Sequence, residues 1–402
     1  MTRLEEDFMD IKSDILSTNG QVVSFVRGGP FFRAQQALGL VRPDQWNVVR
    51  RIGALIVIGW LPLLLVTLFS NPRGLPSFIT AYRIHARMLV VVPALLLGEI
   101  FMESPFGAVL AHLRRAGVLE APDMAYMDAV LARLVRLRDA FFPELAVLVL
   151  LIVHTATSYR GLVDLDPTAW LGQGAGADLR LTAAGWYAVL ISAPLFQFLL
   201  GLGLWKWLLW TFFAFNLSKR NLKLVATHPD EHGGLGFLGL TASAFAPVAF
   251  TATIVIGATW RHDILHHGAR LMDYRLPSIV LVLTIAAIAL GPLLFFVPGL
   301  MALRRTAILE YGILSQIQST EFHDKWILHR AGHESEFLQA TESTTLANFG
   351  NAYKKIAELN PFPADTGSLY VLAAAVAIPA LPVILAVVPL SVVLKDLFHA
   401  LR

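Results

Sequence analysis

The most constraining feature of this chain is a series of apolar runs with few or no charged residues. Five of them reach the length that an α-helix needs to cross about 30 Å of hydrocarbon. They are Ile52–Pro72, Leu181–Trp205, Gly233–Trp260, Leu276–Leu303 and Thr366–Leu394. Two weaker runs, Met88–Met102 and Phe141–Ser158, carry one or two ionisable residues each. Because the runs are continuous rather than alternating, they predict helices and not barrel strands.

Composition supports a membrane environment for most of the chain, since 56% of its residues are hydrophobic and only 15% are charged. We therefore predict an all-α, polytopic transmembrane helical bundle of about seven spans, with cytoplasmic amphipathic helices. The lack of cysteine excludes a disulfide framework, a thiolate metal site and a cysteine nucleophile. Lys and Arg are scattered between the spans, so the net charge of +3 does not indicate nucleic-acid binding.

The distribution of Lys and Arg predicts the orientation of the spans. The extramembrane segments on the N-terminal side of the membrane hold 21 of these residues, and the alternate segments hold 10. By the positive-inside rule, the N-terminus is then cytoplasmic. The predicted parts are an amphipathic cytoplasmic segment (1–51), a membrane domain with six spans and a cytoplasmic helical pair at 104–139 (52–302), a cytoplasmic helical segment (303–368), and the last span with an interfacial helix (369–402).

Outside the spans, apolar residues at helical spacing predict further helices. The expected ranges are 4–17, Pro105–Leu119, Pro122–Ala140, Thr306–Leu328, Glu334–Leu359 and Leu390–Arg402. Arg50 and Arg51 are expected to anchor the first span at the membrane surface. Trp205, Trp207 and Trp210 are expected to form an interfacial belt at the end of the fourth span.

Ionisable residues inside apolar runs are functional candidates, because an unpaired charge in hydrocarbon costs several kcal/mol. Glu99, Glu103, Glu144 and Lys206 all fall in the cytoplasmic half of the predicted bundle, where they form a salt-bridged cluster or line a water-filled path. In the simpler alternative, Lys206 snorkels between tryptophans while Glu103 and Glu144 reach headgroup water. Glu99 is the least well explained in that way and is our first candidate. His154 is the titratable group in the outer half of its span.

Histidines separated by four residues suggest metal sites, because this spacing puts two imidazoles on one face of a helix. The pattern occurs in His228/His232, His262/His266 with the adjacent His267, and His329/His333. The set resembles the histidine boxes of membrane-bound di-iron desaturases and hydroxylases. However, the uncharged run 236–259 separates the first two groups and would place them on opposite faces of the membrane, unless it follows a re-entrant path.

Two smaller metal sites are also compatible with these letters. His228, Glu231 and His232 fit the H-x-x-E-H pattern of inverted zinc peptidases, although Pro229 and the following glycines indicate a turn rather than a helix. Separately, a surface site for a divalent metal would use His262, Asp263, His266 and His267. The alternative for that second group is a polar loop with hydrated imidazoles.

A glycine-rich turn opens the fifth span. Gly233, Gly234 and Gly236 permit unusual backbone dihedrals and close backbone approach. The N–H groups at this helix start could bind an anion, helped by nearby basic residues at 219–223. The alternative is a sharp re-entry turn organised by His228 and by Asp230, which would cap the helix.

The motif His228-Pro229-Asp230-x-x-Gly233-Gly234-Leu235-Gly236-Phe237-Leu238 resembles that of a widespread set of uncharacterised bacterial polytopic membrane proteins. Further similar pieces are Phe322–Trp326, Leu346–Asn348, Asn360–Phe362 and Pro379–Pro382. The resemblance covers roughly the C-terminal half, and the layout of spans is similar over the whole chain. It implies a bacterial inner-membrane location and no particular chemistry. Glu231 and His232 occupy variable positions of the motif, which weakens the metal interpretation.

These observations leave three functional hypotheses open. The leading one is an ion or small-solute channel or transporter that forms a homo-oligomer, with the transported species unknown. The second is a membrane-embedded, histidine-rich metalloenzyme using di-iron or zinc. The third is a membrane scaffold or sensor whose 304–365 segment binds a cytoplasmic partner. We expect the lipid bilayer as a partner and no cofactor, although a divalent metal is compatible with the histidines.

Overall fold

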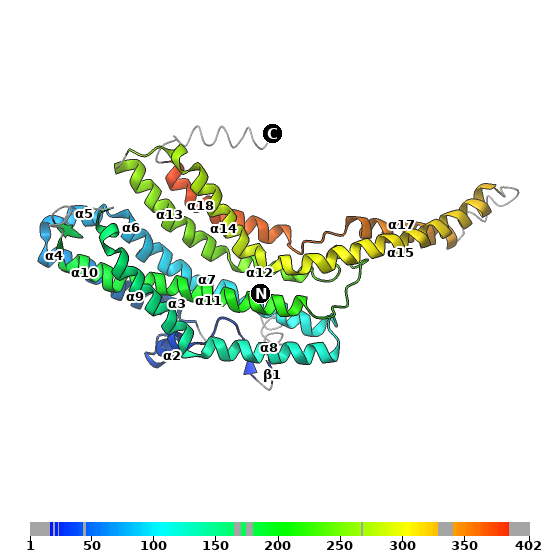
Figure 1. Cartoon of the computed structure of the whole chain (residues 1–402), viewed down its shortest axis with the longest axis horizontal. Helices are drawn as coiled ribbons and strands as arrows, with labels where there is room; N and C mark the ends of the chain where they lie inside the picture. Colours follow the sequence, from blue (N-terminus) through cyan, green and yellow to red (C-terminus); the bar gives the residue numbers. More distant parts are fainter. Residues whose placement is uncertain are drawn as a thin grey trace, which may run out of the picture.

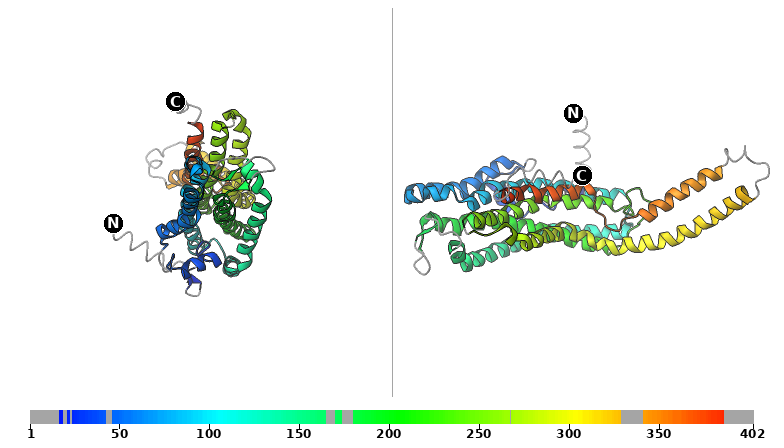
Figure 2. Two further views of the ribbon diagram at one scale, coloured as in Figure 1. Left: turned by 90° about the vertical axis from the view of Figure 1, so that its left-hand side faces the viewer. Right: turned by 90° about the horizontal axis from the view of Figure 1, so that it is seen from above.

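The computed structural model describes residues 17–18, 21–22, 24–42, 46–164, 170–173, 180–266, 268–328 and 341–385. Helices dominate these residues, which confirms the predicted all-α class. Among the described residues, the strands form two short antiparallel ribbons: β1 (Ser17–Thr18) pairs with β2 (Gln21–Val22), and β3 (Gly172–Gln173) pairs with β4 (Arg180–Leu181). The helices pack into an elongated bundle from which one helical hairpin projects (Figures 1 and 2).

Six helical segments of the described chain are long and apolar enough to cross a membrane. They are Val48–Ser70, Tyr82–Arg115, Ala183–Ser218, Gly236–Leu265, Leu271–Leu328 and Thr366–Ile384. The remaining predicted span, Phe141–Ser158, forms α9 (Phe141–Asp164), whose apolar part, Phe141–Thr155, is shorter. Their length and composition identify an integral membrane protein.

The first half of the bundle is built from α2 to α9. The bounds are α2 (Pro30–Ala37), α3 (Val48–Gly59), α4 (Leu61–Ser70), η1 (Pro72–Gly74), α5 (Leu75–Ile79), α6 (Tyr82–His85), the π-helical η2 (Ala86–Val91), α7 (Val92–Arg115) and α8 (Ala121–Asp139), followed by α9. The first span is interrupted between α3 and α4 at Trp60, two residues before Pro62 of α4. Helices α6, η2 and α7 follow one another without a gap and make a single long element (Figure 1).

The second half contains the remaining spans and the projecting hairpin. The bounds are α10 (Ala183–Tyr187), the π-helical η4 (Ala188–Ser192), α11 (Ala193–Ser218), η5 (Gly236–Gly239), α12 (Leu240–Ala244), α13 (Ala246–His266), η6 (Leu271–Tyr274), α14 (Arg275–Leu290), η7 (Gly291–Phe296), α15 (Val297–His323), the π-helical η8 (Asp324–Leu328), α17 (Thr341–Glu358) and α18 (Thr366–Ile384). Helix α13 packs closely against α18 and against α7.

Of the two helices predicted at 104–139, the second is observed and the first is not a separate helix. Pro122–Ala140 corresponds to α8, but Pro105 lies inside α7 and does not begin a new helix. Tertiary packing explains the difference, since Phe106, Val109 and Leu113 are buried in the core directly after this proline. A proline removes one backbone hydrogen bond, and the burial of this apolar face outweighs that loss.

The predicted boundary at residue 303 lies within one helix, because α15 runs through it from Val297 to His323. The span and the extramembrane helix are one continuous element, which pairs with α17 in the projecting hairpin (Figure 2). The described part of the expected helix Glu334–Leu359 forms α17 (Thr341–Glu358), while 334–340 lie outside the described residues. The predictions for 4–16, His267, His329, His333 and Leu390–Arg402 lie outside the described residues.

The largest hydrophobic cluster surrounds Trp210 of α11, which is fully buried. The ring of Trp210 stacks on Phe106 of α7 and on Phe213. Phe25 of the N-terminal segment contacts all three rings edge-on. Trp210 therefore belongs to the core and not to an interfacial belt, and the N-terminal segment is anchored between α7 and α11.

Candidate functional site: a charged cluster between α3, α7 and α11

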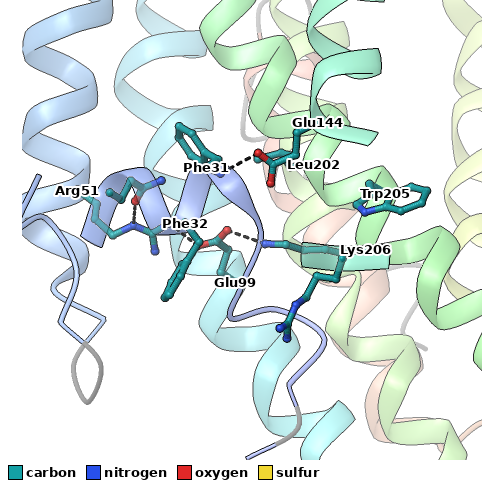
Figure 3. Close-up of a pocket in the computed structure, with 11 residues that line it drawn as sticks. Phe31, Phe32, Arg51, Glu99, Glu144, Leu202, Trp205 and Lys206 are labelled. Carbon is teal, nitrogen blue, oxygen red and sulfur yellow. Dashed lines mark hydrogen bonds and ion pairs between the residues drawn. The ribbon is translucent and has the colours of Figure 1, made fainter. Parts of the chain in front are cut away.

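One carboxylate, that of Glu99 on α7, lies between two cations from other helices (Figure 3). Arg51 Nη2 of α3 is 2.5 Å from Glu99 Oε2, and Lys206 Nζ of α11 is 2.7 Å from Glu99 Oε1. The side chains of Arg51, Lys206 and Glu99 are 1%, 10% and 14% exposed, respectively. Both carboxylate oxygens are thus used, and the three groups together carry one excess positive charge.

The expected position of Arg51 at the membrane surface is corrected, because its side chain is buried. Its position in the first turn of α3 turns its side chain inward, while its neighbour Arg50 is exposed. Lys206 does not snorkel either, because it is buried and bound to Glu99. Pairing explains both cases, since a buried cation is tolerated when a carboxylate lies at hydrogen-bonding distance.

The N-terminal segment adds an uncharged hydrogen-bond partner, Gln35, to this charged cluster. Arg51 Nε donates a hydrogen bond of 2.5 Å to Oε1 of Gln35, which lies on α2 and is 5% exposed. Phe31 and Phe32 precede it on the same helix and also face the cluster (Figure 3). Helix α2 therefore covers the side of the cluster that α3, α7 and α11 leave open.

We call residues 24–37 the strap, because three hydrogen bonds from this segment fasten it to the start of α9 and the end of α8. The N–H of Gly29 donates to Asp139 Oδ1 at 2.9 Å, and the N–H of Phe31 donates to Glu144 Oε2 at 2.7 Å. Arg33 Nη2 donates to the carbonyl of Asp139 at 2.7 Å. Glu144 is buried and holds the strap, so the alternative in which it reaches headgroup water is wrong.

Glu103 holds the beginning of the strap one turn along α7 from Glu99. Ser24 Oγ donates to Glu103 Oε2 at 2.6 Å, while Arg27 Nε lies 3.8 Å from Glu103 Oε1. Arg138 of α8 donates to the carbonyl of Ser24. The acidic residues predicted as a cluster therefore separate into two roles: Glu99 pairs with Lys206, and Glu103 and Glu144 fasten the strap.

Asp139, the last residue of α8, is the best-connected of the carboxylates that bind the strap. Arg138 Nε and Nη2 bind its two oxygens at 2.9 and 2.8 Å. Partial burial acts to raise the pKa of Asp139, but the hydrogen bonds and charge of Arg138 and the N–H of Gly29 outweigh it and hold that pKa below its usual value. Asp139 therefore remains ionised at neutral pH.

Two cavities of about 20 Å³ flank the Glu99–Lys206 pair. The strap cavity lies under α2, with Gln35, Arg51 and Trp205 in its wall. The inner cavity is lined mainly by apolar residues of α7, α11 and α13. Glu99, Leu202 and Lys206 belong to both walls, so the ion pair separates the two cavities. Each volume accommodates about one water molecule.

His154 does not join this cluster. It lies on α9, and its side chain is exposed on the outside of the helix. Its backbone carbonyl accepts a hydrogen bond from Thr157. In this structure, His154 is therefore not a lining residue of either cavity.

The glycine-rich turn is organised by the carboxylate of Asp230. Its oxygens accept hydrogen bonds from the N–H groups of His232, Gly234 and Gly236 at 2.9, 3.0 and 2.8 Å. His228 Nδ1 lies 2.7 Å from Oδ1. Partial burial acts to raise the pKa of Asp230, but these hydrogen bonds hold it below its usual value. The amides that could bind an external anion are thus occupied by a side chain of the turn itself.

The two glycines at the tip of this turn have left-handed backbone conformations. The φ angles of Gly233 and Gly234 are +64° and +93°, in the region that favours glycine. The turn contacts the segment before α18, where Asn360 N–H donates to the carbonyl of Glu231 at 2.8 Å. Two basic residues of 219–223 lie near α8 instead: Arg220 is 3.8 Å from a carboxylate of α8, and Lys223 is 3.4 Å from that of Glu120, directly before α8.

The histidine groups are separated as predicted. The first lies in the turn before η5 and the second in the last turns of α13. Helix α13 has 21 residues, which corresponds to about 30 Å. Asp263 accepts a hydrogen bond from the hydroxyl of Tyr274 at 3.1 Å. Within the described residues, no three His, Cys, Asp or Glu side chains are arranged to hold a metal ion.

Arg51 and Gln35 are the residues of this site that sequence reasoning missed. Arg51 begins an apolar run, where a cation is usually a surface anchor, and Gln35 carries no charge to mark it. One signal was available: the charged residues assigned to the predicted spans are three acidic ones, Glu99, Glu103 and Glu144, but only one cation, Lys206. This imbalance indicates that a further cation pairs with one of them. The chain matches no protein-family model, no curated protein and no solved structure.

Proposed function

We propose that this integral membrane protein is an ion or small-solute channel or transporter whose path passes the Glu99–Lys206 ion pair. The observation that carries the proposal is the position of this pair between two cavities that share it as a wall. Buried charges are costly in a membrane protein and commonly mark ion pathways. Here the pair interrupts the passage between the cavities, so the conformation described is closed.

The strap completes the closure on one side. Phe31, Phe32 and Gln35 line the strap cavity, and the acceptors Asp139 and Glu144 hold the strap in place. For a solute to pass, the strap must move and the ion pair must separate or rearrange. Both elements are held by hydrogen bonds and ion pairs, which can exchange for interactions with water or with an ion.

Flux through proteoliposomes tests this function. Purified protein should release ions from loaded vesicles faster than protein-free vesicles do, and Glu99→Gln should change that rate by about tenfold or more because it alters the barrier between the cavities. Lys206→Arg keeps the charge and serves as a second variant if Glu99→Gln folds poorly. Wild-type flux equal to that of empty vesicles for protons, Na⁺, K⁺ and Cl⁻ would reject the proposal.

Asp128→Asn is the matched control. Asp128 also forms an ion pair with a residue of α7, Arg114, at 2.8 Å, but it lines neither cavity. Neutralising it removes a carboxylate without touching the proposed path. Its flux should equal that of the wild type, and an equal change in both variants would point to a general effect of charge.

The proposal includes a bacterial inner-membrane location, a cytoplasmic N-terminus and a homo-oligomeric assembly. The first rests on the resemblance described above and the second on the bias of Lys and Arg between the loops. Labelling of single cysteines in sealed vesicles tests the orientation directly, because the chain has none of its own. Cross-linking in native membranes tests the assembly.

A second candidate function, a membrane scaffold or sensor, is favoured by the hairpin of α15 and α17. Leu309, Ile313 and Ile317 of α15 are 65%, 64% and 50% exposed and share one face at a spacing of four residues. Helix α15 pairs with α17 in the hairpin that projects from the bundle (Figure 2). A partner recovered by the full-length protein and lost in Ile313→Glu would support this candidate, whereas retention in that variant would argue against it.

A further inference from the structure

The strap cavity carries buried hydrogen-bond donors that have no acceptor among the described residues. They are Arg51 Nη1, Gln35 Nε2 and Trp205 Nε1, and all three residues line the cavity. Arg51 and Gln35 are 1% and 5% exposed, so water outside the protein does not satisfy them. Buried donors of this kind require an acceptor, and the cavity is the space that they share.

The cavity wall also offers more donors than acceptors. It contains the cations Arg51, Arg138 and Lys206 and the carboxylates Glu99 and Glu144, and Arg138 is paired with the neighbouring Asp139. Three of the four oxygens of Glu99 and Glu144 already accept hydrogen bonds, from Arg51, Lys206 and the N–H of Phe31. The wall therefore offers free N–H donors beside Arg51 and Lys206, and few acceptors remain.

The volume limits what can bind there. About 20 Å³ accommodates a water molecule or a monatomic ion and excludes an organic anion. A water molecule would satisfy two donors, but it would bring two hydrogens to a wall with few free acceptors. A small anion accepts from every donor and lies beside the cations Arg51 and Lys206.

We propose that the strap cavity is a binding site for one halide-sized monovalent anion, held by Arg51 Nη1 and Gln35 Nε2 with Lys206 as the neighbouring charge. This inference rests on the proposed function and names a substrate or regulatory ion for it. Gln35 belongs to the strap while Arg51 belongs to α3. The anion thus connects the strap to the bundle and stabilises the closed conformation.

Thermal unfolding of the purified full-length protein in detergent tests the site. The probe is sodium chloride, exchanged for sodium gluconate at constant ionic strength so that screening stays the same. The Tm should rise with chloride and then saturate, because a ligand that binds only the folded state stabilises it by mass action. Bromide should act like chloride, since it has the same charge and a similar size.

Gln35→Glu is the decisive variant. It keeps an oxygen that can accept from Arg51 Nε, but it replaces the free N–H donor by a second oxygen and adds a negative charge to the cavity wall. The variant should be as stable as the wild type in gluconate and lose about tenfold or more of its apparent chloride affinity. Gln36→Glu, the matched control, adds the same charge at the next position of α2, outside the cavity wall, and should retain the chloride response.

The possible results distinguish a failure of the anion-site proposal from a failure of the channel proposal. A wild-type Tm that is the same in chloride and gluconate means that the cavity holds only water and overturns the anion site, as does an undiminished chloride response in Gln35→Glu. Chloride stabilisation that is lost in Gln35→Glu supports the site even if vesicle flux is absent, in which case the channel alone fails. Flux restricted to cations, with no chloride effect on Tm, leaves the channel and rejects the anion.

Discussion

Glu99 and Lys206 are 107 residues apart in the chain, yet their side chains meet at 2.7 Å between α7 and α11. Arg51 approaches the other oxygen of the same carboxylate from α3. A single acidic residue thereby fixes the contact between three helices. Because these groups are largely removed from water, the arrangement depends on Glu99 more than on either cation.

The first prediction concerns the loss of that carboxylate. Glu99→Gln leaves Arg51 and Lys206 as buried cations with no carboxylate between them. Breaking a buried ion pair from one side typically costs about 3–5 kcal/mol, so we expect a clear decrease in Tm. Thermal unfolding in detergent, followed by circular dichroism, measures it.

Glu103→Gln is the control, one helical turn along α7. Its carboxylate contacts a hydroxyl at 2.6 Å and a guanidinium only at 3.8 Å. Arg27 is 31% exposed, and Gln keeps an oxygen that can accept from Ser24, so the same substitution should cost about 1 kcal/mol. Equal losses in the two variants would contradict the central role of Glu99.

The second prediction concerns pH and the Asp230 turn. The pKa of Asp230 is lower in the folded protein than in the unfolded chain, so its ionised form contributes stability above about pH 4. That contribution is lost as the pH falls through the lower, folded-state pKa. Asp230→Asn should cost about 1–3 kcal/mol at neutral pH, and the difference in Tm between wild type and variant should shrink below about pH 4.

Asp273→Asn is a suitable comparison for that experiment. Asp273 makes a single backbone hydrogen bond, to the N–H of Arg270 at 2.8 Å, in an exposed position, whereas Asp230 accepts three. Its substitution should have a smaller effect at every pH. A difference between wild type and Asp230→Asn that stays constant from pH 7 to pH 3 would contradict the assignment.

The class of the protein and most of its spans were predictable from the sequence, because an apolar run longer than the bilayer leaves few alternatives. Glu99, Glu103, Glu144 and Lys206 were found for a related reason, since a charge within such a run is conspicuous. The partners of these residues were not predictable. Arg51 stands at a span border, where exposure and burial give the same pattern, and only the packing of α3 against α7 distinguishes them.

The error at Pro105 and the unforeseen continuity of α15 at residue 303 have a different cause. In both places a local signal, a proline or an increase in polarity, predicted the end of a helix. Tertiary contacts continue the helix instead: α7 buries Phe106 and Val109 beyond the proline, and α15 pairs with α17 beyond residue 303. Neither contact is visible in the residues of a single helix.

A third prediction uses two glycines of α7. A Cβ atom added at Gly98 would lie 2.7 Å from Cβ of Pro247 on α13, whereas one at Gly107 meets nothing within 4 Å. Gly98→Ala should therefore push the two helices apart and cost about 1–3 kcal/mol. Gly107→Ala should leave stability unchanged or raise it by up to about 1 kcal/mol.

Thermal unfolding of both variants gives the comparison. Because the same substitution is made in the same helix, its effect on helix propensity is similar and the difference isolates the contact with Pro247. A Tm for Gly98→Ala equal to or above that for Gly107→Ala would contradict the close packing of α7 on α13.

The last prediction tests whether the strap opens. Gly29 has a φ of +91°, and a Cβ atom there would lie 2.5 Å from Glu144 Oε1 and 3.3 Å from the backbone oxygen of Arg138. Gly29→Ala therefore combines the strain of a backbone conformation that is nearly restricted to glycine, about 1–3 kcal/mol, with a clash at the strap's attachment. The strap should detach more often, and a buried side chain of the strap itself should become reactive.

Val26→Cys supplies the reporter, because Val26 is 1% exposed and the chain has no cysteine of its own. In this background, Gly29→Ala should accelerate maleimide labelling by about tenfold, since 1.4 kcal/mol corresponds to a factor of ten in the opening equilibrium. Gly39→Ala is the control, as Gly39 has a similar φ of +70° but open space around it. Because its strain falls at the end of α2 and away from Glu144, labelling should stay near the rate of the Val26→Cys parent. Equal acceleration by both substitutions would show that backbone strain alone, and not the attachment at Glu144, controls the strap.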